Sequence, residues 1–234
     1  MTLSRICVLS LFFLITSSIN AVSASSEDYS DPQALVDESS VVFQRFKEDP
    51  NMTWFRDNVQ NAKAIFIVPQ MLKAGFIIGG SGGSGALLSK DMKTGDWSYP
   101  AFYTMGSVSF GLQAGGEASE IILMIMTEKG MDSMLTTSFK LGADATVAAG
   151  PVGTGVKAAT TDILAFARSK GAFAGISIEG AVISPRNKWN ESYYGQPTTP
   201  ADIVIRHMVT NPQADKLRAL VTEQGKQTTT KVTY

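Results

Sequence analysis

A run of glycines, GGSGGSG, lies within the stretch FIIGGSGGSGALLSKD at 76–91 and constrains the fold of this chain more than any other feature. Gly80, Gly82 and Gly85 have the GxGxxG spacing of a dinucleotide-binding loop. Such a loop requires a helix directly after the glycines, because the helix N-terminus faces the phosphates. The residues after Gly85 instead reach a charged turn, KDMKTGD, too soon for an amphipathic helix. We therefore expect no nucleotide site in this stretch.

The same glycines predict an unusual sheet. Glycine inside a strand permits bulges, strong coiling and close approach of a neighbouring backbone. A second stretch of small residues, ADATVAAGPVGTG at 143–155, is expected to lie against the first with almost no side chains between them. The expected architecture is a strongly curved, glycine-rich, mainly antiparallel sheet, either open or barrel-like.

Helical patterns at both ends surround a strand-rich middle, which predicts an α+β fold. The first helix is expected over 31–49, because apolar residues recur there with helical spacing and Asp31 before Pro32 is suited to cap its N-terminus. Thr127 and Thr199 are the expected caps of two later helices. Helices are predicted at 31–49, 51–62, 127–139, 199–209 and 212–224. Single strands are predicted at 64–69, 74–90, 120–127 and 141–155, strands with bulges over 99–116, and two strands joined at 169–171 over 163–184.

The first 24 residues have the pattern of a secretory signal peptide. Arg5 precedes an apolar run over 6–15, which is too short to cross a bilayer, and small polar residues follow. Val22 and Ala24 suit cleavage after Ala24, with Ala21 as the alternative. The single cysteine, Cys7, would leave with the signal peptide. Export without cysteines is typical of a protein of the bacterial periplasm or envelope. One domain is expected over 25–234.

Enzyme chemistry has little support in the sequence. His207 is the only histidine, so a histidine-based triad or metal site would depend on it alone. It is expected on one helix face with Ile203, partly exposed, and beside a surface pair of Asp202 and Arg206. Glu117 and Glu120 are interpreted as solvated carboxylates rather than a catalytic pair. Formal net charge of −1 gives no basis for nucleic-acid binding. No metal, cofactor or nucleotide is expected.

Lipid binding has more support. The first helix carries apolar and basic residues side by side, as interfacial helices do, although a helix that packs its apolar stripe on the sheet explains the pattern as well. Four lysines lie around the glycine-rich stretch, either to contact headgroup phosphates or as solvated edge lysines. The aromatic residues Trp97, Tyr99, Phe102 and Tyr103 are expected in the core rather than in an interfacial belt. The candidate lipid-binding residues are Phe43, Arg45, Phe46, Lys47, Lys63, Lys73, Lys90 and Lys93.

Five ordered stretches resemble a known family. They are AKAIFIVPQMLKAGFIIGGSGGSGALL, WSYPAFYTMGSVSFGLQAGGEASEIILMIMTEKGMDSML, KLGADATVAAGPVGTG, SKGAFAGISIEGAVIS and NESYYGQ. Together they resemble the SYLF domain family over about 35–224, a lipid-binding and actin-regulating family with exported bacterial homologues. The resemblance implies binding of acidic lipid of the phosphoinositide type, actin binding in eukaryotic members, and no catalysis. Thr154 after Gly153 departs from the Gly-Arg that is frequent in the family, and it weakens the expectation of actin binding.

The function expected from the sequence is therefore non-catalytic phospholipid binding in the bacterial envelope. A different class of function, a protein-interaction or structural scaffold of the envelope with a protein partner, is the alternative.

Overall fold

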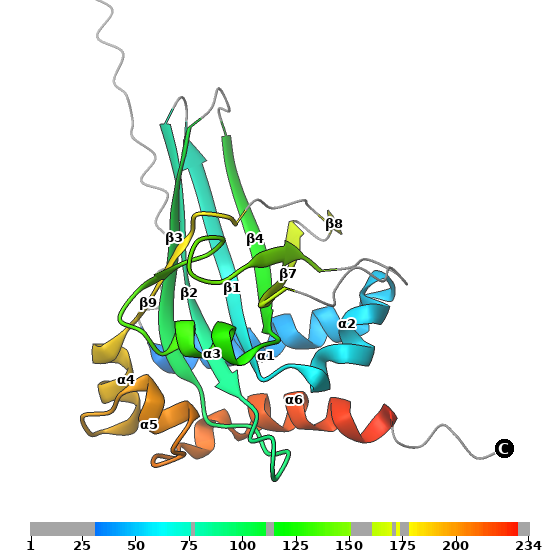
Figure 1. The fold of residues 1–234 in the computed structure, drawn as a ribbon, viewed down its shortest axis with the longest axis vertical. Helices are drawn as coiled ribbons and strands as arrows, with labels where there is room; N and C mark the ends of the chain where they lie inside the picture. The colour runs from blue at the N-terminus through cyan, green and yellow to red at the C-terminus, as the bar shows by residue number, and fades with distance from the viewer. Residues whose placement is uncertain are drawn as a thin grey trace, which may run out of the picture.

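The computed structural model describes residues 31–75, 78–110, 115–150, 161–169, 172–173 and 178–228. Within them one sheet has the strand order β5-β9-β3-β2-β1-β4-β7-β6, with β8 beside β7 (Figure 1). The strands are β1 (Ala64–Gly75), β2 (Ile78–Ser89), β3 (Ala101–Phe110), β4 (Gly115–Ile125), β5 (Phe139–Lys140), β6 (Val147–Ala149), β7 (Ile163–Ser169), β8 (Ala172–Phe173) and β9 (Val182–Pro185).

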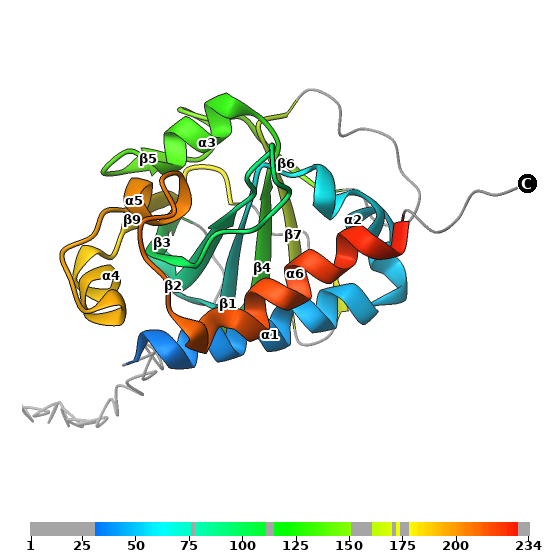
Figure 2. The same ribbon diagram turned by 90° about the horizontal axis from the view of Figure 1, so that it is seen from below.

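All neighbouring strands are antiparallel except β6 and β7, which are parallel. The described strand order has two ends, β5 and β6, and the sheet curls into a half-barrel (Figure 2). The prediction of an α+β fold with a curved, glycine-rich, mainly antiparallel sheet is confirmed, in its open form.

Each face of the sheet is covered by its own set of helices and its own core. On one face lie α1 (Pro32–Glu48), α2 (Thr53–Asn58) and α6 (Asp215–Thr228), with α1 and α6 side by side in Figure 2. The other face is covered by α3 (Glu128–Met134) and α5 (Pro200–Val204). The remaining helices are α4 (Asn187–Tyr194) and the short η1 (Pro50–Met52), η2 (Val59–Asn61) and η3 (Pro212–Ala214).

The central strands are buried on both sides because their side chains alternate between these two cores. Phe66 of β1 belongs to the core under α3 and α5, whereas Ile65 and Ile67 belong to the core under α1 and α6. The fully apolar segment of β4 alternates in the same way. Continuous apolar runs are expected of strands that are covered on both faces.

The first helix packs on the sheet, which decides between the two readings of its apolar stripe. The Asp31 carboxylate accepts a hydrogen bond from the backbone N–H of Gln33 at 2.8 Å and caps α1 as predicted. The stripe residues Phe43 and Phe46 are both 0% exposed. Their rings contact Phe55 of α2 edge to face, with centroids 5.9 Å apart in each pair.

The glycines of β2 allow close approach of β1, as the prediction of an architectural role requires. A Cβ atom on Gly85 would lie 2.5 Å from a ring carbon of Phe66, and one on Gly83 would lie 2.3 Å from the Gln70 carbonyl oxygen. The expected partner stretch was wrong, because β2 lies between β1 and β3 whereas β6 pairs with β7. Part of that stretch, 151–160, lies outside the described residues.

Several predicted boundaries also need correction. The strand expected to stop at Pro69 continues as β1 to Gly75, with a bulge between Ile67 and Leu72. Proline has no N–H for the ladder, and a bulge interrupts the ladder at the point where that donor is missing. The helix capped by Thr127 is confirmed, but it ends at Met134. Helix α4 was not predicted.

Strands β1 to β4 extend beyond the helices at one end of the molecule, at the top of Figure 1. We call this part, which comprises 72–75, 78–83, 106–110 and 115–118, the distal sheet. Ser81 and Ser107 hydrogen-bond across it through their hydroxyl groups at 2.8 Å. The opposite ends of β1 and β2 lie against α3 and α5, where a cleft is formed.

Candidate functional site

A cleft of about 250 Å³ lies at the end of the sheet opposite the distal sheet. Three of the five candidate lysines line it: Lys63 before β1, and Lys90 and Lys93 after β2. The first turn of α3 and the turn after α5 complete its walls. We call it the lysine cleft.

The pairing of β1 with β2 brings the first two lysines together. The backbone N–H of Lys90 donates to the carbonyl oxygen of Lys63 at 2.8 Å, so these residues are direct neighbours at the strand ends. The Lys90 ammonium group donates to the carbonyl oxygen of Gln60 at 2.8 Å. The Lys63 ammonium group pairs with the Glu128 carboxylate at 2.6 Å.

The third lysine lies in a tight turn that Asp91 organises. The Asp91 carboxylate accepts from the backbone N–H of Lys93 at 2.7 Å and from that of Thr94 at 3.2 Å. These two hydrogen bonds lower the pKa of Asp91. Gly95 closes the turn with φ of +80°, a conformation that favours glycine.

His207 forms part of the opposite wall, and the structure corrects its predicted setting. Helix α5 begins with the predicted Thr199 cap, but it ends at Val204, so His207 does not share a helix face with Ile203. The Val204 carbonyl oxygen accepts from the Ser89 hydroxyl of β2 in place of a helical N–H. His207 lies in the following turn with φ of 51°, and Met208 N–H donates back to the Asp202 carbonyl oxygen at 2.9 Å.

Two acidic side chains moderate the positive charge of the cleft. Glu128 and Asp91 face the lysines, but the Glu128 side chain is 76% exposed. An exposed ion pair of this kind contributes about 0–1 kcal/mol, so an incoming anion is able to replace Glu128 at Lys63. The arrangement provides ammonium groups and an imidazole around a space large enough for a small anionic group.

The other candidate residues lie elsewhere. Lys73 is exposed in the distal sheet, where it pairs in register with Ser81. Arg45 on α1 pairs with Glu120, and Lys47 is half-buried. Phe43 and Phe46 are core residues, as described above, and do not reach the surface of the folded domain.

Glu120 is not the solvated carboxylate that was expected. Its side chain is 19% exposed, and its second oxygen pairs with Arg168 of β7 at 3.2 Å. Arg168 also pairs with Asp49 at 3.4 Å. This network joins the end of α1 to β4 and β7. The Glu117 side chain lies outside the described residues.

The aromatic residues near β3 are in the core, as predicted. Trp97, Phe102 and Tyr103 are buried, and burial raises the pKa of Tyr103. Tyr99 is partly buried and donates its hydroxyl hydrogen to Asp215 at 2.8 Å. The prediction of the surface pair Asp202–Arg206 is also confirmed, at 2.5 Å.

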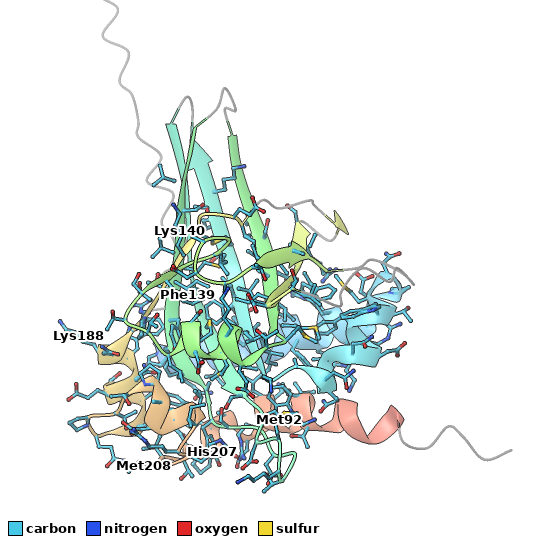
Figure 3. The ribbon with its side chains drawn as sticks, viewed as in Figure 1. Met92, Phe139, Lys140, Lys188, His207 and Met208 are labelled. Atoms are coloured by element: carbon cyan, nitrogen blue, oxygen red, sulfur yellow. The ribbon has the colours of Figure 1, made fainter. Side chains whose placement is uncertain are left out.

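Sequence reasoning missed the apolar residues around the cleft. Met92 and Ile205 line it and are 60% and 52% exposed, and Met208, beside His207, is 67% exposed. Figure 3 shows Met92, His207 and Met208 along the same lower part of the molecule. Met92 between Asp91 and Lys93 in a charged turn was the available indication, because an apolar side chain there has no core to enter.

Two further classes of site are absent from the described residues. No three histidine, cysteine, aspartate or glutamate side chains in that part of the chain gather as metal ligands would. Among the described helices, none combines the length and the apolar character needed to cross a bilayer.

Comparison with known proteins gives the family. The model of the Ysc84 family, described as "Las17-binding protein actin regulator", matches residues 106–224. Protein YSC84 of Saccharomyces cerevisiae is 31% identical over 182 residues, which cover 72% of this chain and 38% of that protein. SH3 domain-containing YSC84-like protein 1 of Bos taurus is 28% identical over 165 residues, which cover 68% of this chain and 48% of that protein. The matched region thus spans less than half the length of these relatives.

Residues 106–224 contain the second half of β3, strands β4 to β9, the cleft wall formed by α3 and α5, and most of α6, whereas β1 and β2 precede them. The matched region also contains four of the five stretches that carry the SYLF resemblance, in whole or in part. This chain belongs to the Ysc84 (SYLF) family.

Proposed function

We propose that this chain is a non-catalytic protein that binds the surface of phospholipid membranes, with the phosphate of an acidic headgroup held in the lysine cleft. The observation that carries the proposal is the convergence of Lys63, Lys90 and Lys93 on one cleft, although they come from two separate strand ends.

The expected mechanism is electrostatic attraction followed by local contact. Each lysine near an anionic leaflet contributes about 1 kcal/mol, and the attraction decays within a Debye length of about 8–10 Å. Because the chain as a whole has a formal net charge of −1, binding depends on this local group of lysines. Binding should therefore weaken as salt is raised.

The test is a pair of matched charge reversals in the chain 25–234, which keeps every residue of both cores. Lys90→Glu with Lys93→Glu should reduce co-flotation with anionic vesicles about tenfold or more, since two favourable lysines become repulsive. Lys73→Glu with Lys140→Glu changes total charge equally, on exposed lysines outside the cleft, and should retain most of the binding. Thermal unfolding of each variant checks the fold. Equal losses in both variants would show a net-charge effect and contradict the assignment of the cleft.

The place of action that we propose is the bacterial envelope, reached by export. The support is the signal-peptide pattern of residues 1–24 and the expected loss of Cys7. N-terminal sequencing of the protein recovered from the periplasm of an expressing bacterium should begin at Ser25. Recovery in the cytoplasm with residues 1–24 still attached would contradict export.

The second candidate is binding of a protein partner. The family description, a Las17-binding actin regulator, favours it. Co-sedimentation with purified actin filaments tests this candidate directly. Binding to filaments without any binding to vesicles would favour the interaction module over the lipid-binding protein.

A further inference from the structure

The large apolar side chains that the described residues expose are not spread evenly. They are Val41, Met92, Val108, Val182, Ile205 and Met208, and three of them lie at or beside the lysine cleft. We call Met92, Ile205 and Met208 the apolar tip. Their exposed fractions of 60%, 52% and 67% place most of each side chain in solvent.

Two separate turns hold the apolar tip outward. Met92 follows Asp91 in the turn after β2, which is closed by the hydrogen bond from Gly95 N–H to the Asp91 carbonyl oxygen at 2.8 Å. Ile205 and Met208 belong to the turn after α5, in which His207 adopts a left-handed conformation. A non-glycine residue in that conformation is uncommon, although histidine is among those that adopt it.

We infer that the apolar tip inserts into the boundary between headgroups and acyl chains of an anionic bilayer, while the lysine cleft holds the phosphates. This inference rests on the proposed function and adds the inserting residues and the orientation. Apolar side chains beside lysines match the two chemistries that a headgroup boundary offers, and methionine adapts well to an irregular surface.

The orientation follows from the direction of β2. This strand of 12 residues runs from the distal sheet to the cleft and is roughly 40 Å long at about 3.3 Å per residue. Insertion of the apolar tip therefore places the distal sheet far from the bilayer. Val108, which pairs in register with Gly80 of the distal sheet and is 72% exposed, marks the far end.

Site-specific labelling tests the orientation. The chain 25–234 contains no cysteine, so Met92→Cys, Met208→Cys and Val108→Cys each accept one nitrobenzoxadiazole label. On addition of anionic vesicles, labels at 92 and 208 should become several-fold brighter and shift to the blue, and the label at 108 should not change. Co-flotation with a response only at 108, or with none, would overturn the inference and leave the proposed function intact. Absence of co-flotation would overturn both.

A second set of variants distinguishes the contribution of apolar insertion to vesicle affinity from the contribution of the lysine charges. Met92→Ser with Ile205→Ser and Met208→Ser should lower vesicle affinity about tenfold and leave thermal unfolding unchanged, because these side chains lie outside both cores. Val41→Ser with Val108→Ser, which removes two exposed apolar side chains away from the cleft, is the control and should bind as the wild type does. Wild-type affinity in the triple variant would show binding by charge alone and contradict insertion.

Discussion

Gly85 illustrates how a single missing side chain determines the packing of two strands. A Cβ atom there would lie 2.5 Å from the Phe66 ring and 2.7 Å from the Ile67 carbonyl oxygen. We expect Gly85→Ala to lower the free energy of unfolding by about 1–3 kcal/mol, because the core must shift to make room. Urea denaturation measures the change. Gly80→Ala is the matched control, since its Cβ would lie 3.5 Å from the nearest atom, and an equal loss in both variants would contradict the steric account.

Asp162 gives a pH dependence with a defined sign. Its carboxylate accepts from the Thr127 hydroxyl at 2.6 Å and from the Thr146 N–H at 2.9 Å, and these bonds lower its pKa to about 2. A depressed carboxyl pKa stabilises the fold above the unfolded value of about 3.9, and this contribution is lost as pH falls toward 2. The Asp162→Asn variant should therefore lose less stability between pH 4 and pH 2 than the wild type. Circular dichroism measured during an acid titration of both proteins checks this. Parallel unfolding curves for the wild type and the Asp162→Asn variant would contradict it.

At the scale of elements, α1 is a structural helix. Phe46 is fully buried against α2, so Phe46→Ala should cost about 3–5 kcal/mol in urea denaturation. Val41→Ala, at a position 37% exposed on the same helix, should change stability by less than about 1 kcal/mol. Below its unfolding transition, the Phe46→Ala protein should float with vesicles as the wild type does. Loss of flotation in the folded variant would show that α1 contributes to membrane binding and would contradict a purely structural role.

Helix starts were predictable because their signals are local. Asp31, Thr127 and Thr199 each accept a backbone N–H within three residues, and each was identified from the sequence. The end of α5 was not predictable in this way. It depends on the Ser89 hydroxyl, which lies 115 residues away in the chain. This hydroxyl donates a hydrogen bond to the Val204 carbonyl oxygen, which therefore accepts none from a following helical N–H.

At the scale of the whole molecule, strand direction decides which candidate residues meet. Antiparallel pairing of β1 with β2 makes Lys63 and Lys90 neighbours at one end of the sheet. Lys73 lies further along β1, opposite Ser81, and belongs to the distal sheet. Their positions around the glycine-rich stretch identified these lysines as a group in the sequence, but only the strand register separates Lys73 from the others. The apolar tip combines turns that are distant in sequence, so a local pattern indicates Met92 but does not predict that Ile205 and Met208 lie near it.

The measurement that tests the central claim most directly is flotation of the chain 25–234 with vesicles of neutral and of anionic phospholipid, at low and high salt. The account predicts flotation with anionic vesicles at low salt, weaker flotation at high salt, and little with neutral vesicles. Absence of flotation under all four conditions would contradict the account, and so would flotation that does not change with either lipid charge or salt concentration.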